Sequence, residues 1–159
     1  MSGLERKISV SGVGALIHTA DGRYLMQLRD DLPEVSMRGY WGLFGGRIED
    51  GEKPCEALMR ELREELGVIV QVHAEAFSEI RYSLEFASSG IHRKLYFEVP
   101  IDEGAIGKLR LYEGERMALH TPEELTVLQN VIPWDLFGVL LHARRQRLRE
   151  VIIRTPDNC

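Results

Sequence analysis

The chain has 159 residues, a formal charge of −5 and ordinary proportions of hydrophobic (44%) and charged (28%) residues. This length suits one domain with a hydrophobic core, and the composition excludes wholesale disorder. No apolar run approaches the ~20 residues that span a bilayer, and the N-terminus lacks the pattern of a secretory signal. We therefore expect a single domain over residues 1–159, with its core at about 7–150, in the cytoplasm and without a membrane partner.

The surplus of acidic residues limits the partners further. Proteins that bind nucleic acids usually carry a basic stripe, and 20 Lys and Arg against 25 Asp and Glu leave no excess to form one. Two cysteines are too few for a disulfide framework or a zinc cluster. We expect no stable nucleic-acid partner, and an anionic substrate would need a bound cation.

Strand-like segments outnumber helical ones. In chain order the pattern predicts strands at 7–19, 24–28 and 40–44, a helix at 54–66, strands at 68–86 and 92–99 joined by a turn at 87–90, a strand at 117–119, a helix capped by Thr121 and a last helix at 134–149. The strands are rich in β-branched and apolar residues, and Pro54 and Gly67 bracket the first helix. The pattern predicts an α+β fold, a sandwich of helices around a mixed sheet.

Residues 54–66 carry the strongest chemical signal. At ~100° per residue, one arc of this helix collects its apolar residues, namely Cys55, Leu58, Met59, Leu62 and Leu66. Glu61, Glu64 and Glu65 fall together on the neighbouring arc, whereas Arg60 and Arg63 lie on the far side. Carboxylates at these spacings repel one another, and no lysine is interleaved. The acidic face either binds a hard cation such as Mg²⁺ or Mn²⁺ through oxygen ligands or is a solvated surface.

The sequence around this helix favours the cation. Residues 46–68 fill every defined position of the pattern G-x5-E-x7-R-E-U-x-E-E-x-G-U, with U apolar, and so resemble the Nudix box. The resemblance extends over about 7–150 and implies a Nudix-like α/β/α sandwich with a loop–helix–loop catalytic motif. It also implies an Mg²⁺- or Mn²⁺-dependent hydrolase that cleaves a nucleoside diphosphate linked to another group, by attack of water on phosphorus.

The resemblance assigns roles to individual residues. The metal ligands that it implies are the Gly46 carbonyl and the carboxylates of Glu61, Glu64, Glu65 and Glu113. Glu52 and Arg60 would brace the motif by an ion pair. Divalent ions suit this chemistry because they neutralise the phosphates and lower the pKa of the attacking water.

The general base is either Glu61 or a glutamate of the loop near 111–115. Within that loop Glu113 is preferred and Glu115 comes next, because the Glu-Gly pair at 113–114 resembles the corresponding family loop. The alternative is that both are surface glutamates in a polar turn.

Several residues besides the defined positions of the box are candidates for binding the substrate. Arg47 follows the Gly-Gly pair and Arg29 ends the second strand, and the guanidinium fork suits phosphates; the alternative is an ordinary surface arginine in each case. Tyr40, Trp41 and Phe44 could stack a nucleobase, although packing in the core is the favoured role for them.

The substrate is less well defined than the reaction. The chain lacks the S-Q-P-W-P-F-P-x-S motif of the NADH-cleaving group, and no proline lies between Pro54 and Pro100, where ADP-ribose hydrolases tend to have one. The compact length and the arginines resemble the nucleoside-triphosphate pyrophosphohydrolases, which release a nucleoside monophosphate and pyrophosphate, sometimes from oxidised nucleotides. The alternatives are a nucleotide-sugar or ADP-ribose type hydrolase and a non-catalytic nucleotide-binding module. Family members are often dimers, so a homodimer is an alternative to a monomer, and the sequence does not distinguish the two.

Overall fold

The computed structural model describes residues 8–83 and 90–154, with side chains described in the last helix as far as Arg145. The sheet has six strands in the order β3-β2-β1-β5-β4, and β6 also pairs with β2. The strands are β1 (Ile8–His18), β2 (Tyr24–Leu28), β3 (Trp41–Gly42), β4 (Ser78–Ser83), β5 (Ile91–Pro100) and β6 (Arg116–His120). β1 runs parallel to β5, and the other pairings are antiparallel, so the sheet is mixed as predicted.

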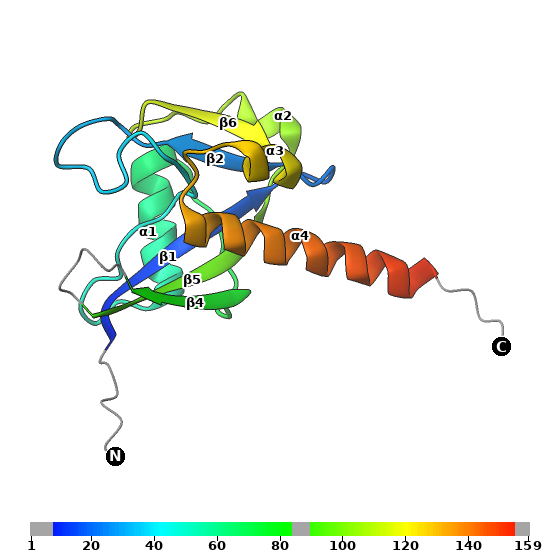
Figure 1. Ribbon diagram of the computed structural model, residues 1–159, viewed down its shortest axis with the longest axis horizontal. Helices are drawn as coiled ribbons and strands as arrows, with labels where there is room; N and C mark the ends of the chain where they lie inside the picture. The colour runs from blue at the N-terminus through cyan, green and yellow to red at the C-terminus, as the bar shows by residue number, and fades with distance from the viewer. Residues whose placement is uncertain (1–7, 84–89, 155–159) are drawn as a thin grey trace, which may run out of the picture.

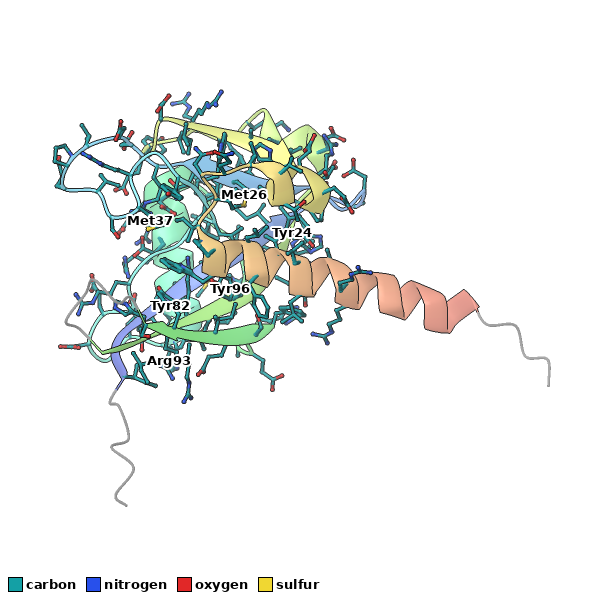
Figure 2. All side chains as sticks on the ribbon, viewed as in Figure 1. Tyr24, Met26, Met37, Tyr82, Arg93 and Tyr96 are labelled. Carbon is teal, nitrogen blue, oxygen red and sulfur yellow. The ribbon has the colours of Figure 1, made fainter. Side chains whose placement is uncertain are left out.

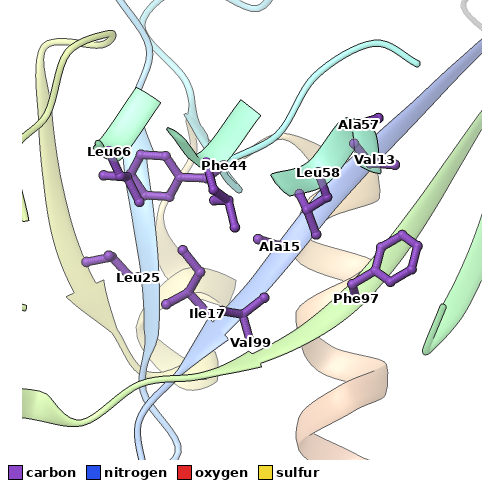
Figure 3. Packing of buried hydrophobic residues seen from close by; sticks show 11 residues of the cluster. Val13, Ala15, Ile17, Leu25, Phe44, Ala57, Leu58, Leu66, Phe97 and Val99 are labelled. Atoms are coloured by element: carbon purple, nitrogen blue, oxygen red, sulfur yellow. The ribbon is translucent and has the colours of Figure 1, made fainter. Parts of the chain in front are cut away.

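Helices cover both faces of this sheet (Figure 1). The helices are α1 (Pro54–Leu66), α2 (Glu103–Ile106), α3 (Pro122–Val127) and α4 (Pro133–Arg154). Because side chains alternate along a strand, Val13 and Ala15 of β1 face α1, whereas Leu16 faces α4. Figure 3 shows the core beneath α1, where Phe44 and Phe97 pack with the buried helix residues. The result is the α/β/α sandwich that the sequence predicts.

The helix α1 has the bounds that its sequence signals predict. Pro54 occupies its first turn, and Gly67 ends it in the left-handed conformation (φ 67°), with its N–H donating to the Arg63 carbonyl at 3.0 Å. Thr121 caps α3 through a capping box with Glu124, also as predicted. These boundaries depend on local interactions, which a sequence pattern records directly.

Three predicted segments differ from the structure. Of the predicted strand 68–86, residues 84–86 lie outside the described residues, and in the described part only β4 is a strand. The alternating apolar residues before β4 pack against the core without a strand partner, and pairing with β5 begins at Phe77. The predicted strand 40–44 shortens to β3, since the Leu43 N–H donates to the Asp135 carboxylate instead of a neighbouring strand. The last helix begins at Pro133 and continues to Arg154, beyond the predicted 134–149.

Two further observations complete the comparison with the predicted elements. The predicted turn at 87–90 lies outside the described residues except for Gly90. No helix in the described ranges is long and apolar enough to cross a membrane.

Candidate active site

The loop before α1 runs alongside the central strand. The N–H groups of Val13 and Ala15 donate to the carbonyls of Gly46 and Phe44, each at 2.8 Å. The N–H of Ile48 donates to the Ser11 carbonyl, which extends this pairing along β1. The loop is therefore fixed to β1, and it places Gly46 beside Glu61 of the helix that carries the glutamates.

Glu65 is buried, with 4% of its surface exposed, although its place on the acidic arc predicts an exposed side chain. Its two carboxylate oxygens accept hydrogen bonds from the Gln27 side chain and from the Gly45 N–H, both at 2.8 Å. Burial raises the pKa of Glu65 to about 7, opposed by these hydrogen bonds and assisted by the charges of Glu61 and Glu113. Glu65 thus links α1 to β2 and to the Gly45–Gly46 turn.

Arg60 reaches further around the helix than its position predicts. Its guanidinium forms a two-bond ion pair with Glu52, at 3.0 Å for each bond, and also contacts Glu61 (2.8 Å) and Glu64 (3.3 Å). A fifth hydrogen bond, to the Arg47 carbonyl at 3.0 Å, ties the helix to its preceding loop. The structure contains the predicted Glu52–Arg60 pair. The same arginine supplies a positive charge to the acidic face, where the sequence pattern places no cation to relieve the repulsion among the carboxylates.

Glu61 lies directly against Gly46. A Cβ placed on Gly46 would be 2.5 Å from Cδ of Glu61, so only glycine leaves room for this carboxylate beside the backbone. Burial raises the pKa of Glu61, and the charges of Glu64 and Glu113 raise it further, whereas Arg60 lowers it. The Gly46 carbonyl and the Glu61 carboxylate therefore occupy one corner of the site.

The loop at 111–115 folds over the C-terminal end of α1. The Tyr112 N–H donates to the Glu65 carbonyl at 2.9 Å, and the Gly114 N–H donates to the Asp30 carboxylate at 3.1 Å. This course brings Glu113 near enough to raise the pKa of both Glu61 and Glu65. Of the two candidate loop glutamates, Glu113 is the one whose charge acts on the helix carboxylates.

The oxygen donors of this corner suit a divalent cation. Four carboxylates, Glu61, Glu64, Glu65 and Glu113, lie within electrostatic reach of one another, and hard cations prefer oxygen ligands. Within the described residues, no three His, Cys, Asp or Glu side chains already form a coordination sphere. Arg60 contacts Oε1 of Glu61 and Oε2 of Glu64, so each of these carboxylates keeps a second oxygen that can bind an ion.

An open pocket of about 190 Å³ adjoins the Gly45–Gly46 turn on the opposite side from α1. Arg29 and Arg47, the two predicted substrate-binding residues, both line it. Arg29 is anchored by a hydrogen bond from its Nε to the Ser36 carbonyl at 2.8 Å, and Arg47 is exposed. Basic side chains therefore lie on the pocket side of the Gly45–Gly46 turn and acidic ones on the α1 side, and we refer to this region on both sides of the turn as the cleft.

The same pocket contains aromatic residues that the sequence analysis missed. Tyr82 of β4 stacks on Trp134 of α4, with ring centroids 4.1 Å apart and planes at 7°, and on His92 of β5 at 5.3 Å and 17°. Figure 2 shows Tyr82 beside the start of α4. Because Trp134 lies 52 positions after Tyr82, no local pattern could have paired them. By contrast, Trp41 and Phe44 are buried in the core, their favoured role.

Comparison with known proteins identifies the family. The family model of the NUDIX domain matches residues 9–142. The chain belongs to the Nudix family. Among curated proteins, this Nudix chain is 30% identical to an RNA pyrophosphohydrolase of Helicobacter pylori (strain G27) over 119 residues, which are 74% of this chain and 75% of that protein. It is 33% identical to a CTP pyrophosphohydrolase of Escherichia coli (strain K12) over 112 residues, 70% of this chain and 76% of that protein.

Solved structures agree on the fold. The crystal structure of a MutT protein from Methanosarcina mazei Go1 superposes with a TM-score of 0.71 at 19% identity, covering 91% of this chain and 99% of that one. With its pyrophosphohydrolase relatives, this Nudix protein is a hydrolase that acts on pyrophosphate bonds of nucleotides. Nudix enzymes generally use divalent metal cations.

Proposed function

We propose that this Nudix hydrolase is an Mg²⁺-dependent nucleoside-triphosphate pyrophosphohydrolase that releases a nucleoside monophosphate and pyrophosphate. The observation that carries the proposal is the polarity of the cleft. Glu61, against Gly46, lies among carboxylates, and the pocket beyond the same turn is lined by Arg29 and Arg47. A protein of net charge −5 can hold a polyphosphate in such a cleft only if cations compensate the carboxylates.

In this proposal the Gly46 carbonyl and the carboxylates of Glu61, Glu64, Glu65 and Glu113 hold the ion. When bound, the ion neutralises phosphate oxygens and lowers the pKa of an attacking water. Glu65 is pre-positioned for this role because Gln27 and the Gly45 N–H fix its carboxylate. Burial raises the pKa of Glu65 to about 7, and a bound cation would favour the ionised form of this carboxylate.

The other residues position the substrate and the motif. Arg60 and Glu52 hold the loop to the helix, and Arg29 and Arg47 contact phosphate oxygens at the open side of the cleft. Glu113 accepts the proton from the water, because it approaches the acidic corner from a separate loop and, being exposed, can pass the proton to solvent. Glu61 and Glu115 are the alternative bases.

The test is a phosphate-release screen with Mg²⁺, in which coupling enzymes convert each product to phosphate. The substrates are nucleoside triphosphates, oxidised triphosphates, ADP-ribose, nucleotide sugars and dinucleoside polyphosphates. Glu64→Gln is the blank, because Glu64 is half-exposed and its replacement should leave the fold intact. Turnover of a triphosphate that is lost in this variant and with chelator supports the proposal, whereas turnover only of ADP-ribose or a nucleotide sugar refutes it.

A second candidate is removal of pyrophosphate from the 5′ end of RNA. The relative from Helicobacter pylori, an RNA pyrophosphohydrolase, favours it. The acidic net charge argues against a long RNA footprint, although an open pocket could admit a 5′ terminus. Adding a 5′-triphosphorylated oligonucleotide to the screen separates the candidates, because a chain specific for RNA ends would release pyrophosphate from it and not from free triphosphates.

A further inference from the structure

The pocket beside the Gly45–Gly46 turn combines a flat aromatic wall with an open floor. Tyr82 and Trp134 form the wall as a parallel stack, and both line the pocket. Because His92 stacks on the other face of Tyr82, a further ring would stack on the outer face of Trp134. The floor is β1, where Gly12 lets the backbone of the turn approach closely; a Cβ there would lie 3.0 Å from the Gly46 carbonyl oxygen. A strand glycine of this kind marks a place where a ligand or another backbone approaches closely.

The polar groups of the pocket are mostly hydrogen-bond donors. The charged and ring-nitrogen side chains that line it are Arg29, Arg47, His92, Arg93 and Lys94, and no carboxylate is among its described lining residues. Arg93 is committed in part to the Ser11 hydroxyl, at 3.2 Å. The pocket therefore complements a group that presents acceptors.

Lys94 is fixed at the base of this pocket. Its Nζ lies 2.7 Å from Oδ1 of Asp135, which is fully buried and also accepts from the Tyr96 hydroxyl at 2.9 Å. An ammonium group has three N–H donors, and this carboxylate takes one of them. The Lys94 side chain retains 14% exposure, so its other donors can reach a ligand in the pocket.

We infer that this pocket binds the nucleobase of the substrate, stacked against the Tyr82–Trp134 pair, and that Lys94, positioned by Asp135, selects bases with an oxo edge. Guanine presents O6 and N7 as acceptors, whereas adenine presents an N6 donor at the corresponding place. Stacking accepts any base, so discrimination falls to the donor. The inference rests on the proposed function because it takes the bound nucleotide to be the substrate. The base-binding site itself can be tested without turnover.

The test measures binding of nucleoside monophosphates in the presence of chelator. Trp134 is one of two tryptophans, and stacking of a base on it should quench its emission. We expect GMP to bind about tenfold more tightly than AMP and ribose 5-phosphate, which has no base, to leave the emission unchanged. In Trp134→Phe the quenching should disappear while calorimetry still detects GMP binding, because phenylalanine preserves a stacking ring.

Selectivity for GMP over AMP is tested with the double variant Lys94→Met and Asp135→Asn. Both charges of the pair are removed together, so no buried charge is left unpaired. The ratio of GMP to AMP affinity should collapse to near one, an outcome that a purely structural role of the pair would not produce. Arg81→Gln is the matched control: this neighbouring exposed residue pairs with Glu79 and does not line the pocket, so the ratio should stay as in the wild type. Equal affinities in the wild-type protein, or quenching by ribose 5-phosphate, would overturn the inference.

The two proposals can fail separately. A protein that binds GMP with this selectivity but hydrolyses no triphosphate would retain the base site and refute the proposed function. A protein that hydrolyses triphosphates, but in which no nucleotide changes the emission of Trp134, would support the proposed function and refute the base site.

Discussion

Replacing Gly46 by alanine should remove most of the activity and leave the fold intact. A Cβ on Gly46 would lie 2.5 Å from Cδ and 2.6 Å from Oε2 of Glu61. Carbon contacts normally begin near ~3.5 Å, so the carboxylate must move by about 1 Å. It can do so, since it is the end of a flexible side chain. A displacement of about 1 Å in a catalytic site can cost about a hundredfold in rate, and we expect kcat/KM to fall on that order.

The preceding glycine provides a matched control with the opposite outcome. Gly45 has a φ of 129°, and a Cβ there would lie 3.0 Å from the carbonyl carbon of Val13 and closer still to its oxygen. A strand backbone cannot swing aside, so Gly45→Ala should lose about 3 kcal/mol or more of unfolding free energy. For a chain of this size that corresponds to a fall in Tm of roughly 6–12 °C.

The assay pairs steady-state kinetics in Mg²⁺ with thermal unfolding followed by circular dichroism. Gly107→Ala serves as the neutral reference, because nothing lies within 4 Å of a Cβ at that position. Full activity of Gly46→Ala at an unchanged Tm would refute the role given to the Glu61 carboxylate. A large fall in its Tm would refute the argument that the side chain, rather than the backbone, gives way.

Three further outcomes are expected. Glu113→Gln should lower kcat more than it changes KM, measured by initial rates, and an effect of Glu115→Gln alone would show that the wrong loop carboxylate carries the proton. Arg60→Lys keeps the charge but loses the planar fork, so unfolding in urea should show a loss of about 1–3 kcal/mol; an unchanged midpoint would contradict the bracing role. Burial lowers the pKa of His142, so the unfolded chain takes up its proton first, near the ordinary value of 6.5. The free energy of unfolding should therefore fall as the pH drops below about 6.5. Melts from pH 8 to 5 should show a flatter pH dependence in His142→Gln, whereas the exposed His73→Gln should keep the wild-type slope.

The parts of the fold that the sequence predicts correctly are those set by neighbours in the chain. The bounds of α1 follow from Pro54, Gly67 and the apolar spacing between them, and the cap of α3 follows from Thr121. The segment 68–77 shows the limit of this reasoning. Its alternating apolar residues predict a strand, but alternation reports burial on one face, and whether a partner strand lies beside it depends on the rest of the fold.

The candidate site divides in the same way. The box glutamates and the Glu52–Arg60 pair are defined by spacing within 23 residues, so the sequence places them. The burial of Glu65 was not predicted, because it depends on Gln27, which comes from β2, far from α1 in the sequence. The stack of Tyr82 and Trp134 likewise joins β4 to α4. One local signal was present: Gly12 and Gly14 share one face of β1, as expected where other parts of the chain approach a strand closely.

Two buried carboxylates fix the backbone between the two ends of the cleft. Asp135 accepts from the Leu43 N–H at 3.0 Å on the α4 side of the sheet, and Glu65 accepts from the Gly45 N–H at 2.8 Å on the α1 side. Asp135 also holds Lys94 in the pocket, whereas Glu65 belongs to the acidic corner. A nucleotide whose base lies against Trp134 would therefore place its phosphates relative to the glutamates through one short, rigid segment. Since placement within about 1 Å governs the rate, we expect loss of base contacts to lower kcat as well as affinity, rather than affinity alone.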